Sequence, residues 1–202
     1  DVLGLAFILP VIYLINDSSI VGATGHLKHP LNEQIKSLLD IYLFSHYRGV
    51  GKTDNKTALL YKWFVFSNTI IRRGLLEKTG PFDERLKSYG GEDTDLAIRL
   101  WEAYPKGLCF SSKAASEHYH KRELYEFCQS MYQYGKTNFQ ILLKKYPLYK
   151  NNLGGQYINS ISGYVIFNPI IRFVVNILGA MIENYWLKRY LVVDSVIRGS
   201  RR

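Results

Sequence analysis

Three carboxylates stand close together in "YGGEDTDLAIRLW", which runs from residue 89 to 101. Glu92, Asp93 and Asp95 follow two glycines and precede apolar residues at helical spacing. A carboxylate held at the start of a helix can take a proton from a hydroxyl group, which is general-base chemistry. Acidic residues also stabilise the free N–H groups and the dipole of a helix N-terminus. The pattern by itself allows both interpretations.

Three further polar motifs surround this stretch. "FSNTIIRR" precedes it and contains Asn68 and Arg72, "GPFDER" begins at Gly80, and "AASEHYH" follows with His118 and His120. A histidine can contact a metal ion or a phosphate, and it can equally be a satisfied structural side chain. Each of these motifs alone is weak, whereas their order along the chain is more specific.

That ordered set resembles the second half of family 2 glycosyltransferases with a GT-A fold, over about residues 1–145. The family shows an Asn followed by an Arg, a Gly-x-Phe-Asp-Glu segment, a Tyr-Gly-x-Glu-Asp-x-x-Leu segment and a downstream His at a strand end. The resemblance implies an inverting transfer of sugar from a nucleotide-sugar donor to a glycan or lipid-linked acceptor.

The resemblance also implies roles for individual residues of the acidic stretch. Asp93 would be the general base, Glu92 would bind or orient the acceptor, and Gly90 and Gly91 would leave room for it. Asp95 is expected to be a helix cap or a charge that faces solvent. For Gly90 and Gly91 a plain turn is the other interpretation.

Asn68 and Arg72, or its neighbour Arg73, match the family segment that lines the donor or acceptor pocket. A strand-to-helix turn explains them equally well. The matching residues of the loop "PFDE", at 81–84, are singled out by the resemblance alone, and a turn with two solvated acids is the alternative.

Members of this family bind the donor diphosphate through a divalent ion, Mg or Mn, held by an Asp-x-Asp motif. The chain has no complete motif of this kind where it is expected. Asp1 precedes the segment "SIVGATG" by a spacing similar to that of the last Asp of the motif, and His118 matches the family histidine near the metal. One hypothesis is that the chain is cut at the metal motif, which makes Asp1 and His118 metal ligands; an ordinary terminal Asp is the other.

Hydrophobic periodicity and turn residues predict strands that alternate with helices as far as residue 120, which indicates an α/β fold. The resemblance makes this a GT-A-like, Rossmann-like mixed sheet flanked by helices and incomplete at its N-terminus. Strands are expected at 19–24, 63–67, 108–112 and 114–118. Helices are expected at 10–16, 31–47, 73–78, 92–104 and 123–145.

The chain changes character after residue 150. "NNLGGQ" at 151–156 is a candidate boundary, so residues 1–150 are expected to be the catalytic part and 151–202 a helical tail. Residues 164–182 are apolar but interrupted by Asn168, Pro169, Arg172, Asn176 and Gly179. This segment is predicted to be amphipathic or re-entrant at a membrane surface, with Trp186, Tyr185 and the terminal arginines at the headgroups. A helical hairpin packed on the catalytic part is the alternative.

Composition limits the partners of this chain of 202 residues. Its formal charge of +9 favours phosphate groups, nucleic acid or an anionic membrane surface. No nucleic-acid partner is expected, because no recognition motif is present and the basic residues are dispersed. The two cysteines, Cys109 and Cys128, lack metal or disulfide spacing and are expected to be buried hydrophobes.

The sequence therefore favours a metal-dependent glycosyltransferase at the cytoplasmic face of a membrane, the location being an analogy with relatives that use lipid-linked acceptors. The alternative is a catalytically incomplete relative that acts as a membrane-associated binding module.

Overall fold

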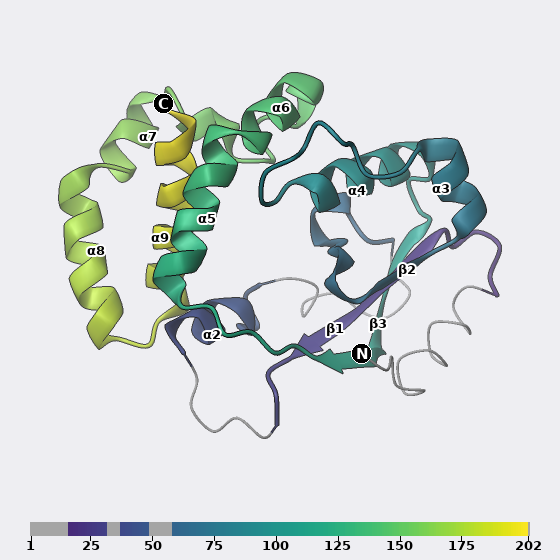
Figure 1. The fold of residues 1–202 in the computed structure, drawn as a ribbon, viewed down its shortest axis with the longest axis horizontal. Helices are drawn as coiled ribbons and strands as arrows, with labels where there is room; N and C mark the ends of the chain where they lie inside the picture. Colours follow the sequence, from purple (N-terminus) through teal and green to yellow (C-terminus); the bar gives the residue numbers. More distant parts are fainter. Residues whose placement is uncertain (1–15, 32–36, 49–57, 202) are drawn as a thin grey trace. The chain divides into compact units, whose positions relative to one another are not determined.

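In the computed structural model, residues 16–31, 37–48 and 58–201 are described (Figure 1). They form two compact units. The described residues of Asp1–Gln34, His46–Asp83 and Glu92–His120 make the first, and those of Ile35–Ser45, Glu84–Gly91 and Lys121–Arg202 make the second. Residues 121–150 thus belong to the same unit as the tail. The expected helix at 10–16 lies almost entirely outside the described residues.

The first unit is built on a three-stranded mixed sheet with the order β2-β1-β3 (Figure 1). β1 (Gly22–Lys28) is central; it pairs antiparallel with β2 (Thr69–Ile71) and parallel with β3 (Leu108–Glu117). Ala23 and Cys109 pair across β1 and β3 and belong to a small apolar cluster on the sheet. The predicted mixed α/β class, with a sheet flanked by helices, is confirmed.

Two of the expected strands are one strand. β3 runs without interruption through the positions expected to separate 108–112 from 114–118. Its pairing with β1 shifts in the middle, because Ser111 lies opposite Gly25 whereas Ala115 lies opposite the next residue, His26. The intervening residues bulge out of the ladder, which explains why the sequence pattern appears broken there.

The prediction of a strand at 63–67 was wrong. The run "WFVFS" lies in and between two 3-10 turns, Tyr61–Trp63 and Phe66–Asn68, and β2 begins only at Thr69. The aromatic side chains still pack, since the rings of Phe64 and Phe66 meet edge to face at 5.4 Å. Aromatic content therefore indicated burial here and not extended backbone.

The helices expected at 73–78 and 92–104 are confirmed as α3 (Arg73–Thr79) and α4 (Glu92–Ala103). Gly80 follows α3 with a φ of 82°, a conformation that favours glycine. Trp101 is half-buried and contacts the ring of Tyr61. The buried residues of α4 lie all round the helix, so α4 is an interior element of the unit: Asp95, Leu96, Ala97, Ile98 and Leu100.

The second unit is helical. Its helices are α2 (Leu38–Leu43), α5 (Leu124–Lys136), α6 (Asn138–Lys145), α7 (Ile161–Ile166), α8 (Pro169–Met181) and α9 (Tyr185–Ser200), with 3-10 turns at Pro147–Tyr149 and Gly155–Tyr157. One apolar cluster joins α2, α5 and α9 around Leu39, Phe127 and Val192. A second joins α6 and α9 around Phe139 and Ile197. α9 is thus the shared element of the unit.

Two predicted helices of this unit differ from the observed ones. The helix expected at 31–47 is described only as α2; a capping box between Ser37 and Asp40 starts it. The helix expected at 123–145 is broken at Thr137, whose φ and ψ of −120° and −92° separate α5 from α6. The start of α2 is set by a local capping box that a hydrophobic period does not reveal, whereas no side-chain N-cap hydrogen bond marks the break at Thr137.

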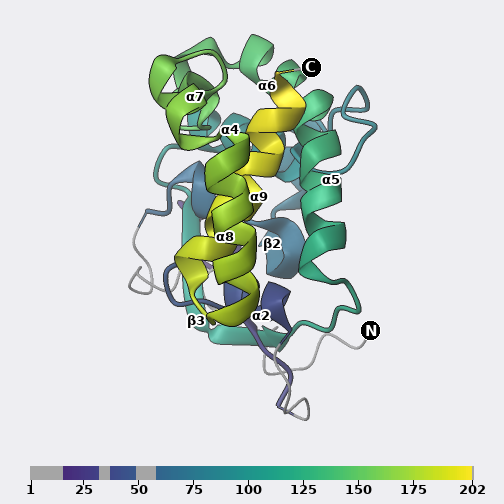
Figure 2. The ribbon, with the colours of Figure 1, turned by 90° about the vertical axis from the view of Figure 1, so that its left-hand side faces the viewer.

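α5 and α9 approach so closely that their backbones touch (Figure 2). A Cβ atom on Gly135 would lie 2.1 Å from the carbonyl oxygen of Val196, and one on Gly199 would lie 2.1 Å from that of Tyr132. Only glycine fits at these two positions, and the close approach fixes α9 against α5. Among the described residues, no helix is both long enough and apolar enough to span a bilayer.

Candidate functional site

Glu92 and Asp93 lie in the first turn of α4. One carboxylate oxygen of Asp93, Oδ2, accepts a hydrogen bond from the backbone N–H of Phe66 at 3.3 Å. Burial raises the pKa of Asp93, the Phe66 hydrogen bond opposes this, and the charge of Glu92 raises the pKa further. The Oε2 atom of Glu92 is buried and has no hydrogen-bond partner among the described residues.

This arrangement suits proton transfer from a hydroxyl group. A carboxylate with a raised pKa is a stronger base, and a rigid helix start holds it in place. The buried oxygen of Glu92 retains its capacity to accept a hydrogen bond, which a hydroxyl donor could satisfy. The pair therefore combines a base with an acceptor that can orient the group losing its proton.

Asp95 does not face solvent, and that expectation was wrong. Its side chain is fully buried and forms an ion pair with Arg99 at 2.9 Å. The guanidinium of Arg99 also donates to the backbone carbonyls that follow α3, namely those of Thr79, Gly80 and Pro81. Asp95 thus supports the loop ahead of Phe82, whose ring contacts Phe66 at 5.5 Å.

Gly90 and Gly91, in the second unit, have positive φ angles of 82° and 95°. A Cβ atom on Gly91 would lie 2.8 Å from the ring of Tyr134 and 3.0 Å from Leu142. Backbone conformation and close packing therefore require glycine here. Their expected part in acceptor binding stays a prediction.

Asn138 is a residue that the sequence analysis missed. It is buried at the start of α6, and its amide nitrogen donates to the carbonyls of Ser88 at 2.6 Å and Gly90 at 2.8 Å. It thereby holds the loop that precedes Glu92 in the chain. No local sequence signal indicated this role, because both acceptors lie about fifty positions earlier in the chain.

Asn68 is buried beside the irregular pairing of β1 and β3. Its amide nitrogen donates to the carbonyl oxygens of His26 at 3.3 Å and Ala114 at 3.1 Å, so it bridges the two strands where their register shifts. Its Oδ1 atom has no hydrogen-bond partner among the described residues. The bridging role is structural; the predicted contact with substrate stays a prediction.

Arg72 holds the start of the sheet together. Its Nε atom donates to the carbonyl of Ile20 at 2.7 Å, and its guanidinium also donates to the carbonyl of Asp17 at 2.9 Å. The neighbouring Arg73 is exposed and forms an ion pair with Glu77 at 3.5 Å. Arg72 is thus the more constrained of the two arginines considered for the substrate pocket.

His118 follows β3, and its backbone N–H donates to the carbonyl of Lys28 at 3.0 Å. Burial lowers the pKa of His118, and the charges of His120 and Arg48 lower it further. Its imidazole is therefore neutral at neutral pH, the form that binds metals. Asp1 lies outside the described residues, and within these residues no three His, Cys, Asp or Glu side chains gather as a metal site.

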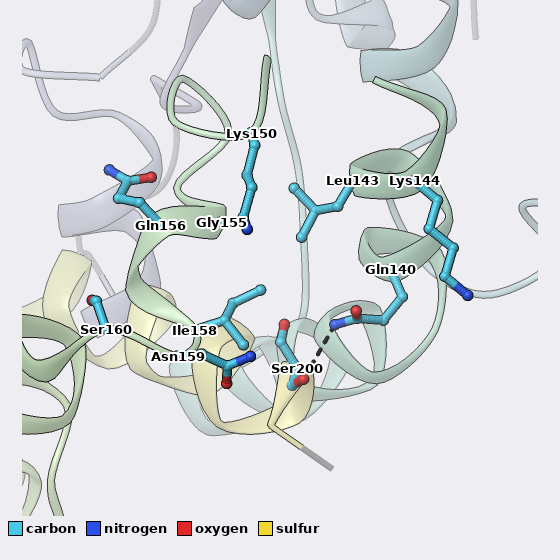
Figure 3. Close-up of a pocket in the computed structure, with 10 residues that line it drawn as sticks. All are labelled: Gln140, Leu143, Lys144, Lys150, Gly155, Gln156, Ile158, Asn159, Ser160 and Ser200. Atoms are coloured by element: carbon cyan, nitrogen blue, oxygen red, sulfur yellow. Dashed lines mark hydrogen bonds between the residues drawn. The ribbon is translucent and has the colours of Figure 1, made fainter. Parts of the chain in front are cut away.

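A separate pocket of about 400 Å³ lies in the second unit, between α6, the C-terminal end of α9 and the segment before α7 (Figure 3). Gln140 donates to the carbonyl of Ser200 across one wall at 3.2 Å. The ammonium group of Lys144 points away from the space in Figure 3. None of the residues predicted to bind substrate or metal lines this pocket.

Both cysteines are free; Cys109 is buried, as expected, whereas Cys128 is only partly buried. Burial raises the pKa of Cys109 to about 11 and also raises that of Cys128, so neither thiol is activated. Comparison of the chain with protein-family models, curated proteins and solved structures finds no match.

Proposed function

We propose that this chain is the acceptor-side part of an inverting glycosyltransferase with a GT-A-like fold. The observation that carries the proposal is the carboxylate pair of α4: Asp93 has a raised pKa and is held by Phe66, and Glu92 keeps a buried oxygen without a partner. The order of the sequence motifs around this pair supports it.

In the proposed reaction the acceptor hydroxyl gives its proton to Asp93 as its oxygen attacks the anomeric carbon of the donor sugar. The bond from that carbon to the diphosphate oxygen breaks at the opposite face, and a nucleoside diphosphate leaves with the bonding electrons. Glu92 accepts a hydrogen bond from the acceptor and orients it. General-base assistance of this kind contributes about 10²–10⁴-fold to the rate.

The proposal includes a divalent ion, Mg or Mn, at the diphosphate, with Asp1 and His118 as ligands. The described residues supply only His118 of this pair and do not by themselves make a metal site. No step of the reaction is therefore assigned to the ion. The neutral imidazole of His118 is suited either to such an ion or to a phosphate oxygen.

The test is release of nucleoside diphosphate from a panel of nucleotide sugars by the full product of the gene, in the presence of candidate glycan and lipid-linked acceptors. We expect Asp93→Asn to reduce release by about 10²–10⁴-fold while binding of the donor is retained. Glu92→Gln is expected to raise KM for the acceptor more than it lowers kcat.

Glu77→Gln is the matched control. Glu77 is an exposed carboxylate of the first unit, and it lies on α3 and not on α4. It is expected to leave release unchanged. Turnover by Asp93→Asn at the wild-type rate would remove Asp93 from the mechanism. Absence of release from every donor, with the protein folded, would favour the catalytically incomplete relative instead.

A further inference from the structure

Helix α8 presents its apolar side outward. Six side chains at helical spacing form one stripe along it and are between 38% and 78% exposed: Ile170, Phe173, Val174, Ile177, Leu178 and Met181. The opposite side of α8, with Arg172 and Gly179, faces α9 (Figure 2). In a globular protein the apolar stripe of a helix ordinarily faces the core, so α8 has the reverse orientation.

The charged side chain of α8 and its first N–H groups have hydrogen-bond partners within the protein. Arg172 makes two hydrogen bonds to the carboxylate of Asp194 on α9, at 2.5 and 3.0 Å. The side chain of Asn168 accepts hydrogen bonds from the N–H groups of Ile170 and Ile171 at 2.8 and 2.9 Å. The guanidinium of Arg172 and the first N–H groups of α8 therefore need no hydrogen bonds from water, which hydrocarbon could not replace.

The other end of α8 is satisfied in the same way. The ammonium group of Lys188, a buried side chain on α9, donates to the carbonyl of Gly179 and, at 3.1 Å, to that of Ile182. These carbonyls belong to the end of α8, where backbone acceptors lack partners inside the helix. Lys188 thus neutralises the C-terminal end of α8 from the α9 side, away from the apolar stripe.

An arginine lies over an exposed aromatic ring near each end of α8. Arg201 lies 4.1 Å from the ring centre of Tyr164, before α8, and Arg189 lies 5.3 Å from that of Trp186, after it. Both rings are about half exposed. Aromatic rings paired with cations are typical of the boundary between hydrocarbon and lipid headgroups.

From these observations we infer that the stripe on α8 inserts into the surface of a lipid bilayer, with Tyr164 and Trp186 at the headgroups. α8 has 13 residues and is about 20 Å long, whereas the hydrocarbon core is about 30 Å thick. It therefore lies along the surface and does not cross it. This inference does not depend on the proposed glycosyl transfer.

The shape and charge of the surface favour lipid over a protein partner. α8 lies at the edge of its unit, and its main helix contact is with α9 (Figures 1 and 2). A bilayer surface accepts an exposed apolar stripe of any shape, whereas a protein partner would need a complementary surface. The exposed charged residues of 169–200 are Arg189 and Arg198 on α9 and Glu183 in the connection before it, and this net positive charge complements anionic headgroups.

The test is flotation of the full chain with vesicles of phosphatidylcholine, alone and mixed with phosphatidylserine. We expect binding to both and stronger binding to the anionic vesicles. The double variant Phe173→Glu/Ile177→Glu is expected to weaken binding to both kinds of vesicle by about a hundredfold. The reason is that it removes two apolar side chains that the bilayer would bury. Both positions are exposed, so the fold is expected to persist.

Leu148→Glu is the control, because Leu148 is an apolar side chain of the same unit that is 93% exposed and lies outside α7 and α8. It is expected to bind like the wild type. Arg189→Gln is expected to weaken binding to anionic vesicles by about fivefold and to leave neutral vesicles unaffected.

Three results would overturn the inference. The first is a wild-type chain that does not float with either kind of vesicle. The second is a double variant that floats as well as the wild type. The third is a wild-type chain that forms a dimer in solution which the double variant converts to a monomer, because the stripe would then be covered by a second copy.

Discussion

The carboxylate of Asp95 is fully buried and paired with the guanidinium of Arg99 one turn later on α4, at 2.9 Å. The same guanidinium donates to three backbone carbonyls after α3. A side chain that looked like a surface charge in the first turn of a helix is therefore the link between α4 and the loop before Phe82. The loop of the Gly-x-Phe-Asp-Glu segment is therefore positioned by Asp95, which lies two residues after Asp93, acting through Arg99.

Asp95→Asn is expected to lower the free energy of unfolding by about 3 kcal/mol, because it leaves a partly buried guanidinium without its counter-charge. Chemical denaturation followed by circular dichroism measures this. Glu77→Gln removes the exposed pair of Arg73 and Glu77 and is expected to change stability by less than about 0.5 kcal/mol. Equal effects of the two substitutions would contradict the buried role of Asp95.

Asp93→Asn is expected to stabilise the fold at neutral pH. Burial raises the pKa of Asp93 above its ordinary value of 3.8, which means that the fold favours the protonated carboxyl. Its contribution to the free energy of unfolding is therefore fully present below pH 3.8 and is lost as the pH rises through the folded-state pKa. The asparagine carries no charge and avoids that loss. The gain should therefore appear near neutral pH and vanish in acid, which denaturation at several pH values would detect. A variant less stable than the wild type at neutral pH would show that the ionised carboxylate is favoured by the fold.

Gly199→Ala is expected to cost about 3 kcal/mol of stability, because its Cβ would lie 2.1 Å from the carbonyl oxygen of Tyr132 and force α9 away from α5. Gly74→Ala in α3 is the matched control, since a Cβ there meets nothing within 4 Å. It is expected to stabilise the protein by about 0.5 kcal/mol through the helix propensity of alanine. Thermal unfolding measures both, and the two substitutions should shift the midpoint in opposite directions.

Gly91→Ala combines an unfavourable φ of 95° with contacts of 2.8 Å to Tyr134 and 3.0 Å to Leu142. Gly154→Ala has a similar φ of 90° but open space around it. We expect Gly154→Ala to cost about 1 kcal/mol from backbone strain and Gly91→Ala to cost about 2–3 kcal/mol, because packing adds to the strain. Denaturation measures both losses of unfolding free energy. Equal losses would contradict the prediction that the close packing of Tyr134 against Gly91 adds to the cost of Gly91→Ala.

The amino-acid sequence predicted the elements that local chemistry controls. α3 and α4 follow from apolar spacing bounded by Gly80 on one side and by first-turn acids on the other. The α/β class follows from the alternation of apolar runs and turns, whereas the mixed sheet was an expectation from the family resemblance. Glu92 and Asp93 could be placed at a helix start from the sequence, whereas their chemical roles were an expectation from the family resemblance.

The sequence could not predict features that depend on residues distant in the chain. Asn68 bridges β1 and β3, and Asn138 binds the loop of Ser88 and Gly90, through contacts separated by more than forty positions. A pattern read along one segment contains no information about these partners.

What the sequence by itself determined is therefore the mixed α/β class, the position of α4 and the identity of Glu92 and Asp93 as candidates for chemistry. Only the tertiary structure decided that Asp95 is buried, that the pKa of Asp93 is raised, and that the apolar stripe of α8 points outward. The physical reason is desolvation: whether a carboxylate or an apolar side chain meets water depends on what packs over it, and that packing comes from other parts of the chain.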